Sequence, residues 1–540
     1  MLKWMHKTLR REALVKISLS VGVGYTADSV KDALVEILPV EKNEIKEIKI
    51  LREELSVDTG AGIGYKLTVG AAFSPDREAG LLKMKKKVSP CPDYTLDIPT
   101  ARKKAAPVIV GSGPAGLFAA MVLCEAGCTP TVIERGLDVD ARIKKVNEFM
   151  LTGRLDSECN IQFGEGGAGT YSDGKLKVGS MDAYKHYILT SFVEAGATED
   201  ILYSTSAHLG TDKLSGIVKR LREKMISMGA TFIYGARMTD FKTKEGRVCA
   251  VEYEKDGKRY TLDTDTLILA AGHSARDVFE LLSAKGVPMQ AKGFGIGVRV
   301  EHPREYINSL VYGKDYPDSL GSASYHLVSH LPNGRSVYSF CMCPGGSVVA
   351  ATSSPCGVVT NGMSEYGRDA DNSNAAILVS VTPEDFGSDS PLAGIEYQKR
   401  IEEGVFGLFG EYRAPAARLC EVYSDSRTVG SGSVRPSYQR GVEHALPGEY
   451  LPDFIADSLK AGFTEFDKWM PGYAFGDAVL TGAETRSTSP VRVLRGDDLA
   501  AIGTAGLYPI GEGAGYAGGI VSSARDGVAC AISLIKARFS

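Results

Sequence analysis

The 540-residue sequence contains no apolar run that could serve as a membrane span or a secretory signal. Its two longest uncharged stretches, residues 105–124 and 336–364, are interrupted by Gly-Ser-Gly-Pro and by Pro344-Gly345-Gly346. We therefore interpret both as buried strands and loops. The basic N-terminus is followed by polar residues and not by an apolar h-region, so we expect a cytoplasmic protein with no membrane partner.

The ten cysteines show no regular pairing interval, which excludes a secreted disulfide framework. Cys341 and Cys343 are spaced as CxC, which differs from the CxxC of thioredoxin-like chemistry. No second Cys or His pair at zinc spacing accompanies them, so no metal is expected. A hydrophobic fraction of 44% and a charged fraction of 24% exclude a disordered, collagen-like or coiled-coil chain. No internal repeat is visible.

The first part of the chain predicts a small α+β module at residues 1–88. Its strand, helix, strand and strand are predicted at 12–22, 28–38, 45–57 and 64–73. A proline-rich linker follows at 89–107. Residues 1–104 carry a net charge of +5 and the remainder −9, which permits an anionic or nucleic-acid partner. Short basic runs are more often solvated connectors, so we expect no nucleic-acid partner.

Beyond the linker the pattern becomes α/β. Strand, helix and strand patterns alternate up to about residue 271, irregular short strands run from 293 to 470, and strand, Gly-rich turn and helix return at 505–536. We predict a discontinuous, doubly wound Rossmann-type domain formed by residues 108–292 and 480–540. A mainly antiparallel β substrate domain at 293–479 is inserted into it.

The strongest motif is a GxGxxG between the strand 108–110 and the following helix. Gly111 permits the tight turn, Gly113 the approach of a pyrophosphate, and Gly116 close packing of helix on strand. Ser112, Pro114 and Ala115 lie in the same loop and face the same phosphates at the helix N-terminus. Glu134, followed by Arg135, ends the next strand, 23 residues after Gly111, where a carboxylate accepts from ribose hydroxyls. The sequence thus predicts a dinucleotide site.

The C-terminal stretch 506–520 resembles the flavoprotein superfamily that includes glutathione reductase and p-hydroxybenzoate hydroxylase. The resemblance implies that Gly511 and Glu512 bind the flavin ribityl chain. It also implies that Gly518, Gly519 and Ile520 place a helix N-terminus near the pyrimidine end of the flavin. The strand ending in Ala271 and Gly272 resembles the third signature of that superfamily, which lies near the cofactor.

A closer resemblance covers nearly all of the chain after the linker. The segments 160–176, 272–277, 297–303, 341–346 and 484–492 resemble a bacterial family of FAD-dependent dehydrogenases. Within that frame, the small residues Gly166, Gly167, Ala168, Gly169 and Thr170 let flavin or substrate lie against backbone, unless they form only a structural loop.

Two single residues are further candidates for cofactor contact. Arg142 could reach the pyrophosphate or be a solvated helix arginine. Met238 could touch the adenine or be an ordinary core methionine.

Candidates for catalysis are ranked poorly by sequence. Cys343 could approach the flavin or pack as a small hydrophobe, and Lys175 could be a polar contact. Arg486 belongs either to an anion-binding wall with Glu484 and Arg492 or to an internal Glu484–Arg486 pair. The histidine candidates for proton transfer are His273, expected to be structural, and three others. These three are His302, His326 and His330.

These motifs predict an FAD-dependent oxidoreductase that transfers hydride through flavin N5 to or from a small-molecule substrate. Only one dinucleotide fingerprint is visible, so any NADH or NADPH is expected to bind transiently in the cleft. Two alternatives stay open: an FAD monooxygenase of the hydroxybenzoate type, and a flavin-bearing RNA- or partner-binding protein that uses the basic N-terminal module.

Overall fold

The computed structural model describes residues 14–58, 62–85, 87–103, 105–177, 179–426 and 432–539. The first thirteen residues of the predicted N-terminal module lie outside this range. Among the described residues, no helix is both long enough and apolar enough to cross a membrane.

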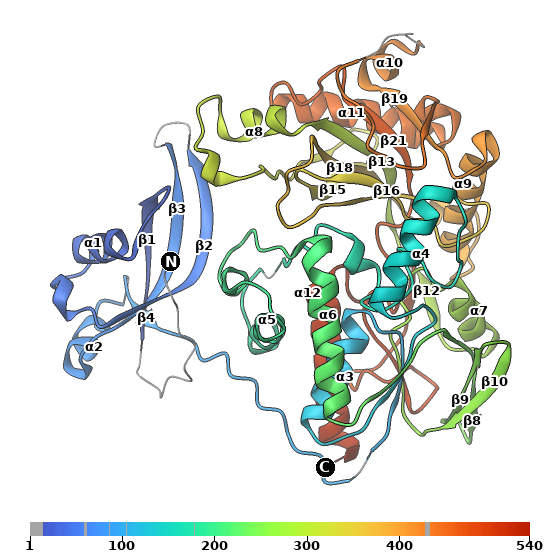
Figure 1. Ribbon diagram of the computed structural model, residues 1–540, viewed down its shortest axis with the longest axis horizontal. Helices are drawn as coiled ribbons and strands as arrows, with labels where there is room; N and C mark the ends of the chain where they lie inside the picture. Colours follow the sequence, from blue (N-terminus) through green and yellow to red (C-terminus); the bar gives the residue numbers. More distant parts are fainter. Residues whose placement is uncertain are drawn as a thin grey trace.

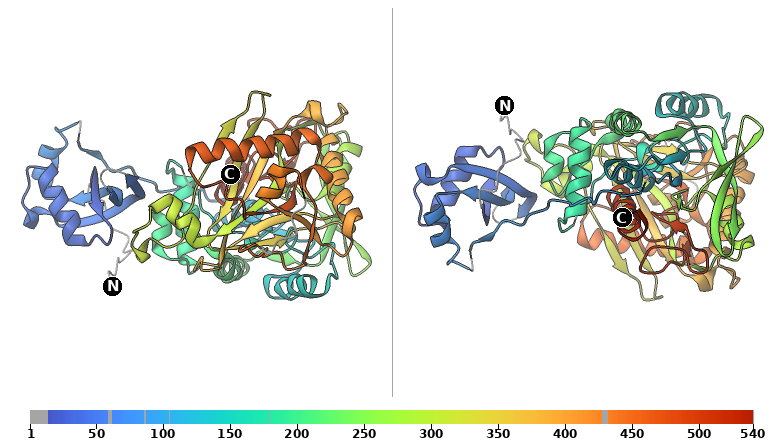
Figure 2. Two further views of the ribbon diagram at one scale, coloured as in Figure 1. Left: turned by 90° about the horizontal axis from the view of Figure 1, so that it is seen from above. Right: turned by 90° about the horizontal axis from the view of Figure 1, so that it is seen from below.

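An N-terminal module stands at one end of the molecule, in blue in Figures 1 and 2. Its four-stranded sheet has the order β2-β3-β1-β4 and is accompanied by two helices. These elements are β1 (Val15–Gly22), α1 (Ala27–Ile37), β2 (Glu47–Asp58), β3 (Gly62–Ala72), α2 (Pro75–Leu81) and β4 (Ser89–Pro90). The helix α1 buries Val30 and Leu34 at i, i+4 spacing against the sheet. The predicted strand, helix, strand and strand are therefore confirmed.

An extended segment joins this module to the main body (Figure 1). Its end is anchored by Ala101 N–H, which donates to Ala126 O at 2.9 Å, and by Arg102 N–H, which donates to Phe539 O at 2.7 Å. The module itself also touches the body, since Glu53 N–H donates to Tyr203 O at 2.8 Å.

The main body contains a five-stranded parallel sheet of order β23-β11-β5-β6-β7. Its strands are β5 (Val108–Val110), β6 (Thr131–Ile133), β7 (Thr231–Ile233), β11 (Leu267–Leu269) and β23 (Leu507–Pro509). All are apolar and buried on both faces except at the β7 edge, as parallel strands usually are. The central strands come from distant parts of the chain, so the predicted discontinuous doubly wound fold is confirmed.

Helices cover one face of this sheet and a small antiparallel sheet covers the other. The helical face carries α3 (Pro114–Glu125), α5 (Ala183–Glu194), α6 (Gly210–Ser227) and α12 (Ile520–Leu534). The opposite face carries β8 (Ala236–Lys244), β9 (Arg247–Lys255), β10 (Lys258–Asp263) and α7 (Arg276–Ala284). Figure 1 shows α12 running behind α6 through the centre of the body.

A seven-stranded sheet forms the second layer, in the order β14-β15-β18-β13-β21-β19-β20. Its strands are β13 (Phe294–Pro303), β14 (Val328–His330), β15 (Ser336–Cys343), β18 (Asn372–Val381), β19 (Ala414–Arg418), β20 (Val442–His444) and β21 (Val479–Glu484). All neighbours are antiparallel except β19 and β20, which agrees with the predicted mainly antiparallel insert. The strand β21 crosses residue 480, the predicted end of that insert, and belongs to this sheet.

Helices and two short strand pairs surround the second layer. They are α4 (Val139–Thr152), α8 (Arg304–Tyr312), α9 (Ala393–Phe409), α10 (Leu419–Ser424) and α11 (Asp453–Trp469), with the pairs β16 (Ser347–Ala350) and β17 (Thr360–Met363), and β12 (Met289–Ala291) and β22 (Val491–Val493). Four buried side chains of α11 join the sheet core, namely Ile455, Leu459, Phe463 and Phe466.

Candidate functional site

A cleft of about 330 Å³ lies at the carboxyl ends of the parallel strands β5, β6, β11 and β23. Ligands of open α/β sheets bind at this edge. Most of the predicted cofactor residues line the cleft: Gly111, Gly113, Pro114, Ala115, Glu134, Arg135, Gly167, Ala168, Gly169, Met238, Ala271, Gly272, Gly511, Glu512, Gly518, Gly519 and Ile520. Ser112, Gly116, Arg142, Gly166 and Thr170 are not part of the lining.

The glycines of the GxGxxG loop do different work. Gly111 has a φ of 101°, and a Cβ there would collide with the carbonyl of Ala270 at the end of β11. A Cβ on Gly116 would collide with the carbonyl oxygen of Gly111, so this glycine permits close packing of α3 on β5. Gly113 has room for a Cβ, whose nearest neighbour would be Gly167 Cα at 3.7 Å. Gly113 and Gly167 thus form a bare backbone surface on the cleft wall.

Two helices point their N-termini at the cleft without side-chain caps. Gly113 is the N-cap of α3 and Gly519 the N-cap of α12, and neither end has a side-chain hydrogen bond. Unsatisfied N–H groups and the positive end of the helix dipole favour an anion or developing negative charge at such ends.

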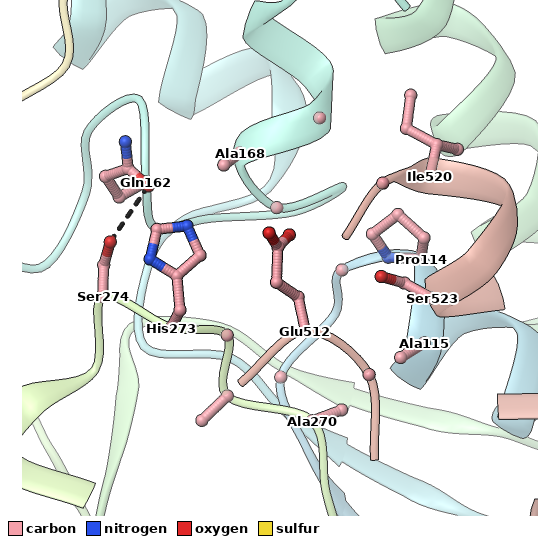
Figure 3. Close-up of a pocket in the computed structure, with 18 of the residues that line it drawn as sticks. Pro114, Ala115, Gln162, Ala168, Ala270, His273, Ser274, Glu512, Ile520 and Ser523 are labelled. Carbon is pink, nitrogen blue, oxygen red and sulfur yellow. Dashed lines mark hydrogen bonds between the residues drawn. The ribbon is translucent and has the colours of Figure 1, made fainter. Parts of the chain in front are cut away.

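Glu512 provides a carboxylate inside the cleft. It points between His273 and Pro114 in Figure 3. Within the described residues its carboxylate has no recorded hydrogen bond, and burial raises its pKa to about 7, opposed by the charge of Lys292. A buried acceptor without a protein partner fits a ligand that brings hydroxyl groups. Together with the uncapped helices and bare glycines, it fits the polyol and pyrophosphate of a flavin dinucleotide.

Glu134 lines the cleft, but its carboxylate is already used by the protein. Oε2 accepts from the N–H and the hydroxyl of Ser112, both at 2.8 Å. Oε1 accepts from the N–H groups of Gly136 at 2.9 Å and Gly164 at 3.1 Å. Glu134 and Ser112 therefore hold three loops together at the nucleotide end, and a ribose contact would have to share these oxygens.

Arg142 lies elsewhere than predicted. It is fully buried, and its guanidinium donates to the backbone carbonyls of five residues, namely Asn160, Ile161, Gly164, Glu165 and Gly167. These bonds fold the loop after α4 into the cleft wall, which gives Arg142 a structural role in place of the predicted pyrophosphate contact. Gly166 and Thr170 belong to the same loop and face Val218 and each other, away from the cleft.

Arg135 and Met238 lie at the predicted adenine end. Arg135 pairs with Asp277 and with Glu158, the latter at 3.1 Å, and its guanidinium lies over the ring of Phe163. Met238 is buried in β8 and contributes both to the core below the sheet and to the cleft wall.

The opposite wall of the cleft comes from the second layer and carries paired charges. Lys175 donates to the carbonyl of Met342 and lies 3.9 Å from Asp173, whose carboxylate also binds Arg368. Burial lowers the pKa of Lys175, and the Asp173 charge opposes this. Lys175 is therefore a cation at the cleft surface with donor capacity left for a ligand.

Glu484 and Arg486 do not pair with each other, so the predicted internal pair is wrong. Glu484 binds the buried Arg299, with Nη2 and Oε1 2.9 Å apart. Arg486 binds Glu402, and Arg276 binds the same carboxylate at 2.9 Å. Both Glu484 and Arg486 line the cleft, but the Arg486 guanidinium is held by Glu402 and by Ser353.

The remaining catalytic candidates are placed differently from each other. His326 is exposed and Cys343 is fully buried, and neither is part of the cleft lining. His302 and His330 lie elsewhere too, bonded to Tyr473 O and to Ser336. His273 does line the cleft, and burial with the charges of Arg486 and Arg276 lowers its pKa to about 3.

The cleft also contains residues that the sequence did not single out. They are Cys341, Asn361 and the hydrogen-bonded pair Ser274 and Gln162, whose Oγ–Oε1 distance is 3.1 Å. Cys341 belongs to the CxC spacing, so this spacing was the available signal, although the side chain at the cleft is the first cysteine and not the second. Asn361 lies in β17, a strand with no motif to mark it.

Comparison with solved structures finds distant likenesses only. The chain is 13% identical to the flavin-dependent brominase Bmp2, with 81% of each chain covered and a TM-score of 0.37. It is 12% identical to the L-amino acid deaminase from Proteus myxofaciens, with 83% and 94% covered and a TM-score of 0.34. It is 11% identical to a flavoprotein/dehydrogenase from Cytophaga hutchinsonii, with 80% and 79% covered and a TM-score of 0.34. Scores this low say nothing about the reaction of this chain.

Comparison of sequences is more informative. Residues 104–141 match an FAD binding domain, and residues 293–487 match a family described as FAD-dependent protein, C-terminal domain-like. An uncharacterized protein from Clostridium beijerinckii is 46% identical over 440 residues, which cover 81% of this chain and 82% of that protein. The predicted cofactor, FAD, is thereby confirmed. The chain belongs to the same family as the Clostridium protein, and its two matched segments identify it as an FAD-dependent protein.

Proposed function

We propose that this FAD-dependent protein is an oxidoreductase acting on a small-molecule substrate. The observation that carries the proposal is the cleft itself, in which helix N-termini and a free carboxylate on one wall face charged and polar side chains on the other. When bound, FAD supplies hydride transfer at its N5 atom. The protein then has to bind the cofactor, orient the substrate, exclude water and manage protons.

The first wall is assigned to the cofactor. The N-terminus of α3 at Gly113 and Pro114 would bind the pyrophosphate, because its N–H groups are uncapped. Glu512 would accept from ribityl hydroxyls. The N-terminus of α12, beginning at Gly519 and Ile520, would stabilise negative charge at the pyrimidine end. Ala168 would lie against the flavin ring, on a segment with small side chains.

The second wall is assigned to the substrate. Lys175 is the group we expect to exchange a proton or hydrogen bond with it, because burial lowers its pKa and its ammonium lies at the cleft surface. His273 is neutral at physiological pH and can serve as a hydrogen-bonding group only. A nicotinamide nucleotide that reduces the flavin would bind transiently in the same cleft.

The proposal is tested on purified protein by its visible spectrum, followed by anaerobic reduction with NADH and with NADPH. We expect an oxidised flavin spectrum that one of the two nucleotides bleaches. Protein that stays colourless after incubation with FAD contradicts the proposal. Aerobic turnover in the presence of candidate aromatic compounds then separates the monooxygenase alternative, since a hydroxylated product would replace the dehydrogenase assignment.

A further inference from the structure

Two cysteines of β15 lie together where this strand leaves its regular pairing. The register between β15 and β18 shifts between Phe340 and Cys343. At Cys341 the backbone φ is 40°, in the left-handed region that residues other than glycine seldom adopt. The Cys341 side chain lines the cofactor cleft, and Cys343 is completely buried behind it. Unusual backbone of this kind concentrates at functional sites.

The two thiols are already in contact. Cys343 Sγ donates to the Cys341 carbonyl oxygen at 3.2 Å, and the two side chains are hydrogen-bonded to each other. Residues two apart in a strand have Cα atoms about 6.6 Å apart, inside the range of about 4.4–6.8 Å that a disulfide spans. A disulfide between Cys341 and Cys343 therefore requires no movement of another element.

Two cations distinguish the sulfurs. Arg299 donates to the carbonyl of Cys341 at 2.8 Å, and Lys175 donates to the carbonyl of Met342. The hydrogen bond from Cys343, followed by the charges of Arg299 and Lys175, lowers the pKa of Cys341. The same hydrogen bond and burial raise the pKa of Cys343. The outer sulfur at the cleft is the better nucleophile, and the inner one is held as a thiol.

We propose that Cys341 and Cys343 form a redox-active dithiol that reduces a small disulfide compound in the cleft. The proposal rests on the proposed function, because it names the substrate class of that oxidoreductase. Only the Cys341 side chain reaches the cleft, which is lined by both domains, so the disulfide must be small enough to enter beside the cofactor.

The proposed reaction balances as two thiol–disulfide exchanges. The Cys341 thiolate attacks one sulfur of the substrate, the substrate S–S bond breaks, and the departing sulfur takes a proton from solvent. Cys343 then gives its proton to solvent and its sulfur attacks Cys341 Sγ, which releases the second substrate thiol and leaves a Cys341–Cys343 disulfide. Two electrons and two protons from reduced FAD, with the nicotinamide nucleotide as the primary donor, restore the dithiol.

The decisive experiment treats the holoenzyme with oxidised glutathione and maps its cysteines by peptide mass spectrometry. We expect a Cys341–Cys343 disulfide that dithiothreitol reverses. In Cys343→Ser the reaction should stop at a mixed disulfide between Cys341 and glutathione, and in Cys341→Ser neither product should form. Cys420→Ser, at an exposed cysteine away from the cleft, is the matched control and should behave as wild type.

Anaerobic titration with dithionite provides a second readout that does not depend on turnover. Oxidised wild type should take up about four electrons per bound FAD, and Cys341→Ser about two, because the disulfide is itself a two-electron couple. Cysteines that stay reduced in glutathione-treated holoenzyme overturn the dithiol, whether or not NADH reduces the flavin. A disulfide that forms in protein whose flavin neither nucleotide reduces supports the dithiol and overturns the proposed electron donor.

Discussion

Arg486 and Glu402 form a buried ion pair that uses both carboxylate oxygens, with Nε 3.0 Å from Oε1 and Nη2 2.8 Å from Oε2. Arg276 donates to the same carboxylate at 2.9 Å, and Thr485 adds a hydroxyl at 2.8 Å. One carboxylate thus compensates two arginines beneath the substrate wall and joins α7, α9 and the segment after β21.

Replacing Glu402 should therefore destabilise the protein strongly. In Glu402→Gln two buried guanidinium groups lose their counter-charge, and removing one partner of a buried pair costs about 3–5 kcal/mol. The free energy of unfolding in urea measures this loss. Glu403→Gln, at the exposed neighbouring position on α9, is the matched control and should change stability by less than about 0.5 kcal/mol.

The same carboxylate predicts a pH dependence. Burial alone would raise the pKa of Glu402, but Arg486 and Arg276 outweigh it and lower the pKa from 4.5 to about 2. A folded-state pKa below the unfolded value contributes stability that is complete above the unfolded pKa and is lost as pH falls toward the folded one. The stability difference between wild type and Glu402→Gln should therefore be constant from pH 7 to about 5 and narrow below that. A difference that widens on acidification contradicts the assignment.

Two glycines of one loop should separate cofactor binding from folding. In Gly113→Ala the new methyl group would meet nothing closer than Gly167 Cα at 3.7 Å, and φ is an ordinary −73°. The fold should keep its stability while the methyl group blocks the pyrophosphate, so FAD content falls at least tenfold. In Gly116→Ala the methyl group would collide with the Gly111 carbonyl, so stability should fall by about 3 kcal/mol. Thermal unfolding and the flavin-to-protein absorbance ratio distinguish the two variants.

Glu512 should make FAD affinity depend on pH. A hydrogen bond to a charged acceptor is worth more than one to a neutral acceptor, so Glu512→Gln should raise the Kd for FAD about tenfold above pH 7. Because the pKa of Glu512 is about 7, the difference from wild type should shrink below that pH. Flavin fluorescence on titration of apoprotein measures both values. Asp497→Asn, at an exposed position nearby, should leave the Kd unchanged at every pH.

The sequence predicted the fold well because backbone requirements leave direct marks on it. Gly111 and Gly116 have to be glycine for steric reasons, and a strand and helix flank them at the required spacing. The split of the FAD domain was likewise visible, since the Gly-rich turn before α12 has the same form as the one before α3.

The charged side chains of the site were predicted less well, because their partners are set by strands far apart in sequence. Glu484 and Arg486 alternate on one segment, yet the bulge between β13 and β21 and the packing of α9 give them separate partners, Arg299 and Glu402. Arg142 was misassigned for a related reason, since its position on α4 does not reveal that a later loop folds over it. No local pattern records such pairings.

The construction of the parallel sheet has a consequence for biosynthesis. The edge strand β23 and the helix α12 come from residues 507–534, near the end of the described chain, and β23 pairs with β11 from the middle. A nascent chain that has been translated only to residue 506 lacks Glu512 and one of the two helix ends facing the cleft. FAD capture is therefore an event that follows translation of nearly the whole polypeptide, and the module at residues 14–90 has to fold without help from the cofactor.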